Sequence, residues 1–295
     1  PAVRLASLAD RASIVRTFRN PDDVLRFEPT SEPDNDRPLP KPPTDDHEAY
    51  LLFTSGSTGI PKGVPISHVG LAGYLDFALS NYFVSDPQPV APLFTALTFD
   101  LTITTLFAPI LAGGRIVTLA ATGPAALAEL AATVGITWCK ATPSHLEILA
   151  SLLPSDHQLA TCVVGGEAFR SDLAERLLHH NPDMTIFNEY GPTEAVVGCM
   201  IHHVDPATNA GQAAVPIGTP APRVELRVVD PGGTRVPLGT PGELLISHNG
   251  ITRGYLDGDD HAGQRQPFIE LDDRRFYRSG DLVVRNQDFG LTYLG

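Results

Sequence analysis

Short apolar runs alternate with amphipathic segments through the middle of the chain. The apolar run 49–53 predicts a buried strand, and an amphipathic segment at 69–79 follows it. Further along, strand-like runs and helical patterns alternate, at 125–134, 136–140, 144–153, 160–164, 171–180 and 185–187. This alternation predicts an α/β layer with a largely parallel sheet.

The pattern changes after residue 216. Residues 224–229 alternate with a period of two, a Pro-Gly-Gly turn follows at 231–233, and another strand is predicted at 242–246. Before the α/β layer, residues 28–46 are rich in proline and acidic residues and predict an irregular connector. We therefore expect a partial N-terminal segment with the connector at 1–45, an α/β subdomain at 46–215 and a β-rich subdomain at 216–295.

Composition narrows the class of protein. The 295 residues are 42% hydrophobic and carry a formal net charge of −13, without a Lys/Arg cluster, which argues against a nucleic-acid partner. No apolar run approaches the roughly 20 residues of a membrane span, and no signal peptide is recognised. The odd number of cysteines, Cys139, Cys162 and Cys199, predicts buried free thiols and a cytoplasmic, reducing location.

A loop rich in hydroxyls and glycines follows the first strand. Residues 54–63 contain four hydroxyls, three glycines and one lysine. Backbone N–H groups, hydroxyl donors and a cation in so short a loop favour a phosphate ligand, although a flexible linker with a solvated lysine has a similar composition. The spacing around Lys62 is not that of a Walker loop. The candidate phosphate-binding residues are Thr54, Ser55, Gly56, Ser57, Thr58, Gly59 and Lys62.

Two later segments also combine turn residues with carboxylates. In the segment 188–194 an aromatic residue, a Gly-Pro turn, a hydroxyl and Glu194 follow a strand. An aromatic ring can stack on a nucleobase, and a carboxylate beside phosphates suits Mg²⁺, whereas an ordinary turn would leave Glu194 solvated. In the segment 277–282, Asp281 follows a glycine and could accept both hydroxyls of a ribose.

The three motifs in this order resemble those of adenylate-forming enzymes: acyl-CoA synthetases, luciferases and the adenylation domains of non-ribosomal peptide synthetases. The resemblance covers residues 46–295. It implies the large N-terminal core of such an enzyme, with mixed and parallel sheets, packed helices and a smaller, distorted-barrel subdomain. The family's mobile C-terminal subdomain, with its catalytic lysine, and part of its N-terminal sequence are expected to be missing.

The resemblance also implies roles for individual residues. Tyr190 would stack on adenine with help from Asn188, Asp281 would hold the ribose, and Thr193 would contact the α-phosphate of ATP. Lys62 would share the phosphates, and Glu194 would hold Mg²⁺. The implied nucleotide site also includes Gly166, Glu167 and Gly191. The segment 242–255 resembles a structural motif of the family with His248 in place of the usual glycine, which we interpret as a local loop difference.

The segment beginning Phe99-Asp100 resembles the start of the family's substrate-binding helix. In amino-acid-activating members an aspartate follows the aromatic residue and pairs with the substrate ammonium; Asp100 could also be a simple helix N-cap. The other implied pocket positions are Leu101, Thr104, Lys140, Val163, Gly165, Glu189, Val197 and Gly198. This set resembles the asparagine selectivity code, and the similar aspartate code has His where Glu189 stands. A structural Lys140–Glu189 ion pair is the alternative interpretation.

The sequence therefore predicts an adenylation domain that uses ATP and Mg²⁺ to activate L-asparagine, with aspartate as the next candidate. The resemblance implies that a carrier domain's phosphopantetheine thiol would accept the aminoacyl group, with a condensation domain nearby in the synthetase. Two other functions stay open at this point. One is an acyl-CoA or other acyl-AMP ligase, against which Asp100 argues, and the other is a nucleotide- or amino-acid-binding fragment without efficient turnover.

Overall fold

A five-stranded sheet in the order β5-β6-β7-β8-β9 forms the centre of the α/β part. The computed structural model describes residues 44–55, 61–86, 88–154, 156–205, 212–256, 258, 266–287 and 290–295. The strands are β5 (Trp138–Ala141), β6 (Thr161–Val164), β7 (Thr185–Tyr190), β8 (Met200–His203) and β9 (Thr219–Pro220). The first three are parallel, and β8 and β9 join antiparallel, so the sheet is mixed.

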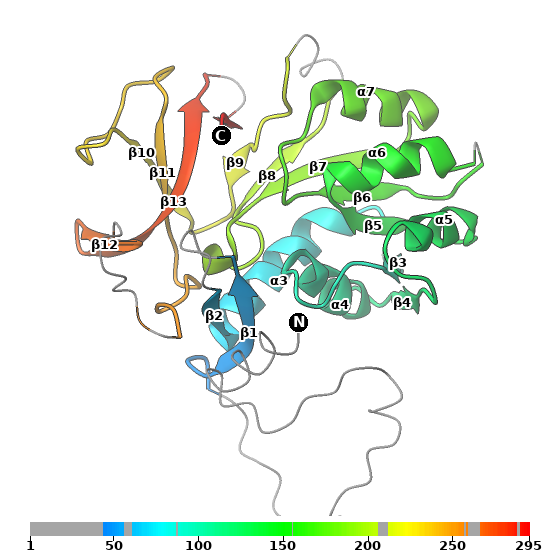
Figure 1. The fold of residues 1–295 in the computed structure, drawn as a ribbon, viewed down its shortest axis with the longest axis horizontal. Coiled ribbons are helices and arrows are strands. Elements are labelled where there is room, and N and C mark those ends of the chain that lie inside the picture. Colours follow the sequence, from blue (N-terminus) through cyan, green and yellow to red (C-terminus); the bar gives the residue numbers. More distant parts are fainter. Residues whose placement is uncertain are drawn as a thin grey trace, which may run out of the picture.

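Helices cover both faces of this sheet (Figure 1). One face packs against α5 (Pro124–Ala132), α6 (Pro143–Leu152) and α7 (Ser171–His180). The other face lies toward α3 (His68–Tyr82) and α4 (Leu101–Leu111). β5 and β6 are buried along their whole length, as expected for parallel strands that are covered by helices on both faces. The helical and strand patterns of the sequence are confirmed here.

Side chains along β5, β6 and β7 alternate between the two faces. Cys139, Cys162 and Ile186 belong to the core under α5, α6 and α7. Trp138 and Val163 belong to the core on the side of α3 and α4. Because successive side chains of a strand point to opposite faces, Lys140 shares the face of Trp138. A charged residue is therefore built into a buried, apolar surface.

Two smaller paired units complete the α/β part. β1 (Glu48–Thr54) pairs antiparallel with β2 (Lys62–Ser67), and β3 (Val90–Leu93) pairs parallel with β4 (Arg115–Thr118). The sequence placed Lys62 in the phosphate loop, whereas in the structure it is the first residue of β2 and lies opposite Thr54. The pairing of β1 with β2 therefore fixes Thr54 and Lys62, the two residues that flank the segment 55–61.

The C-terminal part is an open antiparallel sheet. It contains β10 (Glu225–Val229), β11 (Gly242–Ser247), β12 (Phe268–Leu271), β13 (Arg274–Arg285) and β14 (Leu291–Tyr293). The order is β10-β11-β13-β12, with β14 beside β13. The expected distorted barrel is wrong for the described strands, because β10 and β12 are unpaired with each other and the sheet does not close.

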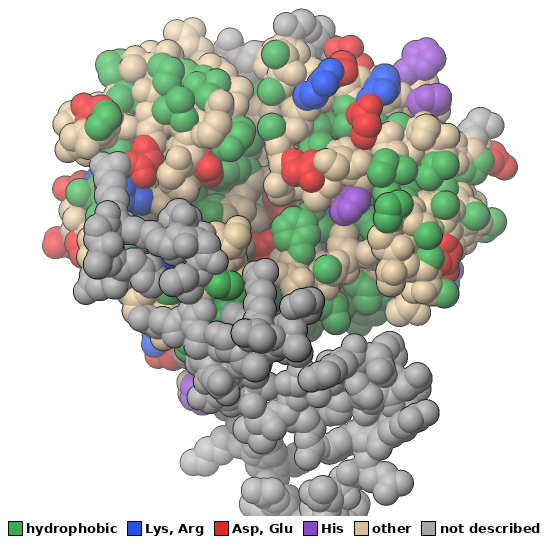
Figure 2. All heavy atoms as spheres, viewed as in Figure 1, with side chains coloured by type: hydrophobic (Ala, Val, Ile, Leu, Met, Phe, Trp, Pro, Cys, Tyr) green, Lys and Arg blue, Asp and Glu red, His purple; other side chains and the backbone are tan. Residues whose placement is uncertain are grey.

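The two parts meet through a shared core and a short backbone contact. Buried residues of β8, β11 and β13, among them Met200, Leu244 and Val283, pack together. The N–H of Ile217 donates to the carbonyl of Leu291 over 2.8 Å. On the face that Figure 2 shows, the surface is hollowed between the α/β part and the C-terminal part. Lys and Arg side chains on this face lie singly or beside acidic side chains.

All three cysteines are buried free thiols, as the sequence predicted. Cys139 and Cys162 lie opposite each other on β5 and β6, and the Sγ of Cys139 donates to that of Cys162 over 3.5 Å. The hydrogen bond with Cys139 and burial raise the pKa of Cys162, and burial raises the pKa of Cys199, so these two thiols stay protonated. Among the described residues, each helix is too short or too polar to cross a bilayer.

Candidate active site

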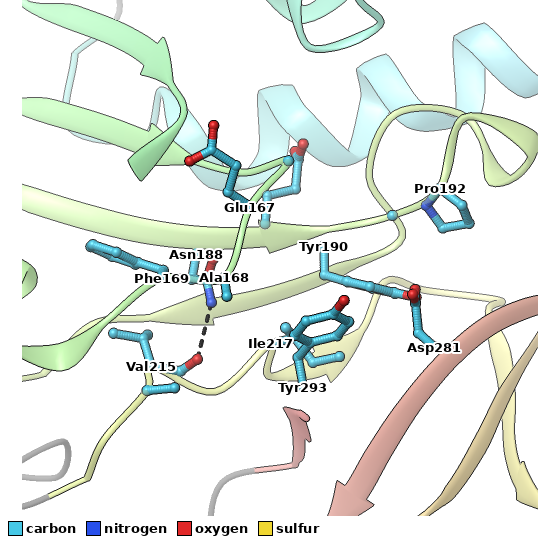
Figure 3. A pocket seen from close by; sticks show the side chains of 14 residues that line it. Glu167, Ala168, Phe169, Asn188, Tyr190, Pro192, Val215, Ile217, Asp281 and Tyr293 are labelled. Atoms are coloured by element: carbon cyan, nitrogen blue, oxygen red, sulfur yellow. Dashed lines mark hydrogen bonds between the residues drawn. The ribbon is translucent and has the colours of Figure 1, made fainter. Parts of the chain in front are cut away.

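A pocket of about 210 Å³ lies between the end of β7 and the C-terminal sheet (Figure 3). It brings together residues that the sequence assigned to nucleotide binding, namely Gly166, Glu167, Asn188, Tyr190, Gly191 and Asp281. Its apolar walls come from residues that sequence reasoning missed, namely Ala168, Phe169, Val215, Ile217 and Tyr293. The apolar run 215–217, just before Gly218, was the available signal for one of these walls.

Tyr190 and Asp281 are in direct contact at one side of this pocket. The hydroxyl of Tyr190 donates to Oδ2 of Asp281, which joins β7 to β13. Burial raises the pKa of Asp281, and the hydrogen bond from Tyr190 opposes that rise. Burial and the nearby Asp281 carboxylate raise the pKa of Tyr190. The pair is thus a protonated phenol beside a carboxylate acceptor, which suits the hydroxyls of a sugar.

Asn188 and Glu167 shape the pocket through contacts with the protein. The side-chain amide of Asn188 donates to the carbonyls of Val215 over 3.3 Å and of Pro216 over 2.8 Å. Glu167 accepts hydrogen bonds from the N–H and the hydroxyl of Ser144 at the start of α6. In this structure Asn188 therefore holds the pocket wall at residues 215–216 in place, and Glu167 connects the pocket to the start of α6.

A second hollow of about 510 Å³ adjoins the first, because Asp281 lines both. Lys62, Tyr255, Tyr277 and Arg278 also line it. The Nζ of Lys62 lies 4.8 Å from the centre of the Tyr255 ring. Of the predicted phosphate-binding residues, Gly56, Ser57, Thr58 and Gly59 lie outside the described residues. Thr54 is the last residue of β1, and Ser55 follows it. The lysine thus lies beside the hollow that continues from the first pocket.

The turn η1 (Thr193–Ala195) links the second hollow to α4. The Oε1 of Glu194 accepts a hydrogen bond from the Tyr255 hydroxyl over 2.7 Å, and the carboxylate is buried. The Oγ1 of Thr193 donates to Oδ2 of Asp100 over 2.6 Å. The Thr193 hydroxyl thus connects the turn that carries Glu194 to Asp100, the residue that precedes α4.

Asp100 occupies the N-cap position of α4 without acting as a cap. Its side chain makes no capping hydrogen bond and turns instead to Thr193. Burial raises the pKa of Asp100, while the Thr193 hydrogen bond and the Lys140 charge oppose the rise. A buried carboxylate with one hydroxyl partner is poised to bind a cation.

The charged pocket positions meet under α3. Lys140 of β5 and Glu189 of β7 form a salt bridge, and their side chains are 1% and 2% exposed. The Nζ of Lys140 also donates to the Tyr74 hydroxyl over 3.0 Å and to Thr104 Oγ1 over 2.8 Å. The hydroxyls of Tyr74 and Tyr82 both donate to Oε2 of Glu189. Lys140 and Glu189 are therefore paired in the structure, and the pair lies among the predicted pocket positions.

Two of the remaining predicted pocket positions are glycines that leave space for Glu189. A Cβ on Gly198 would lie 2.3 Å from Cδ of Glu189, so only glycine fits there. A Cβ on Gly165 would approach the Glu189 carbonyl oxygen to 3.0 Å. Phe99 packs over Gly166, which adopts a φ of +82°. Leu101, Val163 and Val197 are buried nearby.

Tyr74 and Tyr82 were missed by the sequence reasoning. Both lie on α3, and an amphipathic helix predicts buried aromatic residues without showing where their hydroxyls end. The only available signal was their spacing. Tyr74, Ala78 and Tyr82 are four residues apart and share one helix face, which is buried.

We expect Asp281→Asn to weaken ATP binding by about tenfold or more, because hydrogen bonds to a charged acceptor are worth about 1.5–3 kcal/mol. In the predicted role, the ionised carboxylate would be the stronger acceptor for the ribose hydroxyls. Because the pKa of Asp281 is raised by burial, ATP affinity should fall with decreasing pH earlier than for an ordinary aspartate. Calorimetric titration at several pH values measures this fall.

The matched control for this prediction is Asp183→Asn, at an exposed aspartate outside both hollows. It should leave ATP affinity unchanged. Subtracting the Asp281→Asn curve from the wild-type curve removes the titration of ATP itself. Identical pH curves for the wild type and Asp281→Asn would remove Asp281 from the nucleotide site.

Comparison with known proteins gives a consistent result. The family described as AMP-binding enzyme matches residues 4–256. The chain is 37% identical to bacitracin synthase 3 of Bacillus licheniformis over 258 residues, which are 85% of this chain and 4% of that protein. It is 34% identical to the D-alanine–D-alanyl carrier protein ligase of Lactiplantibacillus plantarum over 260 residues, 85% of this chain and 50% of that protein.

Solved structures show the same fold. A nonribosomal peptide synthetase protein with adenylation and PCP domains, bound to a vinylsulfonamide inhibitor, matches with a TM-score of 0.83 and 26% identity. The match covers 100% of this chain and 53% of that one. The adenylation domain AlmE of Vibrio cholerae, in complex with glycyl-adenosine-5'-phosphate, matches with a TM-score of 0.76, 28% identity and coverage of 85% and 48%.

The chain spans half or less of the curated relatives it matches. The family match nevertheless covers most of the chain, including Lys62, Tyr190 and Tyr255 of the two hollows, whereas Asp281 lies beyond it. The sequence identity to these relatives and the fold shared with the solved structures agree with the resemblance inferred from the order of the three motifs. The chain therefore belongs to the AMP-binding enzyme family and has the fold of the adenylation domains of nonribosomal peptide synthetases.

Proposed function

We propose that this chain activates L-asparagine with ATP, forming asparaginyl-AMP and pyrophosphate. The single observation that carries the proposal is the buried Lys140–Glu189 pair, on the sheet face toward α3 and α4, close enough to Asp100 that Lys140 lowers and Glu189 raises its pKa. Asp100 would supply the acidic group for the substrate ammonium. Lys140 would supply a donor and Glu189 an acceptor for the side-chain amide, which is the combination that asparagine needs.

The nucleotide would occupy the two adjoining hollows. The adenine would lie in the apolar pocket beside Tyr190, and the ribose hydroxyls would bind Asp281, which lines both hollows. The phosphates would then extend toward Lys62. A solved relative of the same fold carries glycyl-adenosine-5'-phosphate, which supports a site for an aminoacyl-adenylate in this chain.

The amino acid would bind between Asp100 and the Lys140–Glu189 pair. Its ammonium would pair with Asp100, a buried carboxylate at the start of α4. Its side-chain carbonyl would accept from Lys140, and its NH₂ would donate to Glu189. Two charge-assisted hydrogen bonds would thus take the place of the direct contact between Lys140 and Glu189.

Aspartate and glutamine fit less well for different reasons. Aspartate would bring a second carboxylate against Glu189, and like charges at such distances repel by about a few kcal/mol at intermediate dielectric. Glutamine adds one methylene, which a pocket discriminates by about 1–3 kcal/mol. Charge therefore disfavours aspartate, and length disfavours glutamine.

The reaction needs positioning and charge neutralisation. A carboxylate oxygen of the amino acid attacks the α-phosphorus of ATP, the bond to the bridging oxygen breaks, and pyrophosphate leaves with that oxygen. Lys62 would neutralise charge on the phosphates. The Thr193 hydroxyl would turn from Asp100 toward the α-phosphate. Because Thr193 contacts Asp100 in this structure, this movement would couple occupancy of the amino-acid site to the nucleotide site.

The residues present fit Mg²⁺. Glu194 is a buried carboxylate oriented by the Tyr255 hydroxyl, and Mg²⁺ commonly takes one or two carboxylates with phosphate and water oxygens. Glu194 would hold the ion, and the ion would neutralise charge on the phosphates. Tyr255 would keep the Glu194 carboxylate in position.

The adenylate would then pass to the phosphopantetheine thiol of a carrier domain. Relatives of this chain include a carrier protein ligase and a protein that contains adenylation and PCP domains. Attack of the thiol sulfur on the acyl carbon would form a thioester and release AMP. The carrier domain is therefore the partner that we propose.

We expect asparagine to bind at least about tenfold more tightly than any other of the twenty amino acids, since charge repulsion or a methylene is worth about that much or more. Glu189→His should shift the preference toward aspartate by removing the like charge. Calorimetric titration with each amino acid, in the presence of a non-hydrolysable ATP analogue, measures the preference without requiring turnover. Pyrophosphate exchange driven by each amino acid is the second readout.

Glu147→His is the matched control, because Glu147 forms an exposed ion pair on α6. It should leave the preference unchanged. An unchanged preference in Glu189→His would remove Glu189 from the pocket. Preference for an apolar amino acid or an aryl acid in the wild type would overturn the assignment of asparagine.

A further inference from the structure

The Glu189 carboxylate is held by more than its lysine partner. Its Oε1 accepts from Lys140, and its Oε2 accepts from the hydroxyls of Tyr74 and Tyr82. All the groups involved are buried, with Tyr82 only 1% exposed. Water therefore has little access to replace a lost donor, so each phenol matters for the orientation of the carboxylate.

The two phenols differ in what else they touch. The Tyr74 hydroxyl also contacts Lys140 and Thr104. The Tyr82 hydroxyl is hydrogen-bonded to Glu189, while its ring packs against Phe77 and Phe187 at centroid distances of 6.0 and 5.3 Å. Tyr82→Phe would therefore remove one donor to Glu189 and leave the aromatic packing in place.

We propose that Tyr82, together with Tyr74, is a specificity-determining positioning residue that presents the Glu189 carboxylate to the substrate side chain as a fixed acceptor. This inference rests on the proposed function. With Oε2 occupied by two phenols, only the Oε1 edge, shared with Lys140, remains for a substrate. A fixed acceptor binds the NH₂ of an asparagine side chain and repels the carboxylate of aspartate.

The state of the two phenols supports this role. Burial and the Glu189 charge raise the pKa of both Tyr74 and Tyr82 far above the usual tyrosine range. Both phenols thus keep their protons and remain donors throughout the physiological pH range. Helix α3 carries them on one face, four residues either side of Ala78, whose small side chain is fully buried.

We expect Tyr82→Phe to weaken asparagine binding by about tenfold, because a Glu189 carboxylate that is no longer held in orientation loses its hydrogen bond from the substrate NH₂, and a hydrogen bond to a charged acceptor is worth about this much. Aspartate binding should weaken less, since a carboxylate that can rotate repels it less, so the asparagine-to-aspartate affinity ratio should fall. Calorimetric titration of both amino acids, with a non-hydrolysable ATP analogue present, gives this ratio. ATP affinity should stay unchanged.

Tyr50→Phe is the matched control. Tyr50 packs against the same core, and its hydroxyl is buried without a hydrogen-bond partner among the described residues. Its loss should leave the ratio unchanged. If Tyr82→Phe does not fold, Tyr74→Phe is the second variant, and it should lower the ratio as well.

Glu189→Gln separates the inference from the proposed function. It should change the ratio, and adding Tyr82→Phe to it should change the ratio no further. A ratio that responds to Glu189→Gln but not to Tyr82→Phe or Tyr74→Phe would overturn the inference alone. A ratio that does not respond to Glu189→Gln would overturn the proposed function and the inference with it.

Discussion

Replacement of Asp100 by asparagine is expected to weaken amino-acid binding by about 100-fold or more while leaving ATP binding intact. Removing one partner of a buried, hydrogen-bonded charge pair costs about 2–5 kcal/mol, and Asp100 is the buried carboxylate that would face the substrate ammonium. The substitution keeps the size of the side chain. Calorimetric titration of asparagine, with and without a non-hydrolysable ATP analogue, measures the loss.

The same substitution should not destabilise the fold. Because burial raises the pKa of Asp100, its contribution to stability is fully present below the unfolded pKa and is lost as pH rises through the folded pKa. Above the folded pKa of Asp100 the ionised carboxylate is therefore a cost that asparagine removes, and the Thr193 hydroxyl can still donate to the amide oxygen of the new side chain. We expect an equal or higher melting temperature at pH 7.

Wild-type affinity for asparagine should fall as pH decreases through the raised pKa of Asp100, since the protonated carboxyl no longer attracts an ammonium. Asp183→Asn, at an exposed position, is the control and should bind asparagine as the wild type does. An Asp100→Asn variant with wild-type affinity for asparagine would show that the ammonium binds elsewhere.

Lys140→Met should cause the largest loss of stability. It leaves the Glu189 carboxylate buried without its cation, and removing one partner of a buried ion pair costs about 3–5 kcal/mol. The double variant Lys140→Met, Glu189→Gln should recover part of this loss, with a coupling energy of about 1–3 kcal/mol. Urea unfolding of the wild type, the two single variants and the double variant measures the cycle.

An exposed ion pair provides the control for this cycle. Arg176 and Glu147 are 2.6 Å apart with side chains 49% and 56% exposed, so Arg176→Met should cost about 1 kcal/mol or less. Losses that simply add in the Lys140 and Glu189 double variant would show that the two groups act independently. That result would argue against a paired donor and acceptor in the pocket.

Much of the α/β part follows from the sequence. The amphipathic pattern of 171–180 corresponds to α7 with the same bounds, and the apolar run 49–53 lies within β1. Such patterns are reliable because one helix face or a whole strand must be buried. The strand β2 was missed because the Gly/Ser/Thr-rich composition before it indicates a loop, whereas Lys62 already pairs across from Thr54.

The C-terminal sheet shows a limit of sequence reasoning. Period-two alternation identified β10, and a second strand was predicted at 242–246 within β11, but such patterns do not tell how the edges of a sheet pair. The barrel was an implication of the resemblance. Closure depends on long-range pairing of β10 with β12, which the structure lacks.

The candidate site was predictable where the sequence places a charged residue within an apolar, buried strand. Lys140 in an apolar strand requires a partner, and the structure supplies Glu189. By contrast, the hydroxyls of Tyr74 and Tyr82 and the contact between Thr193 and Asp100 depend on the packing of distant elements. An aromatic residue on a buried helix face has the same sequence pattern whether or not its hydroxyl holds a charge.

The most direct test of the central claim is a crystal structure of the chain with a non-hydrolysable asparaginyl-adenylate analogue. We expect the ammonium within hydrogen-bond distance of Asp100, the side-chain amide against Lys140 and Glu189, and the ribose at Asp281. An analogue that binds with its amide turned away from Lys140 and Glu189, or that leaves Asp100 without an ammonium, would contradict the account.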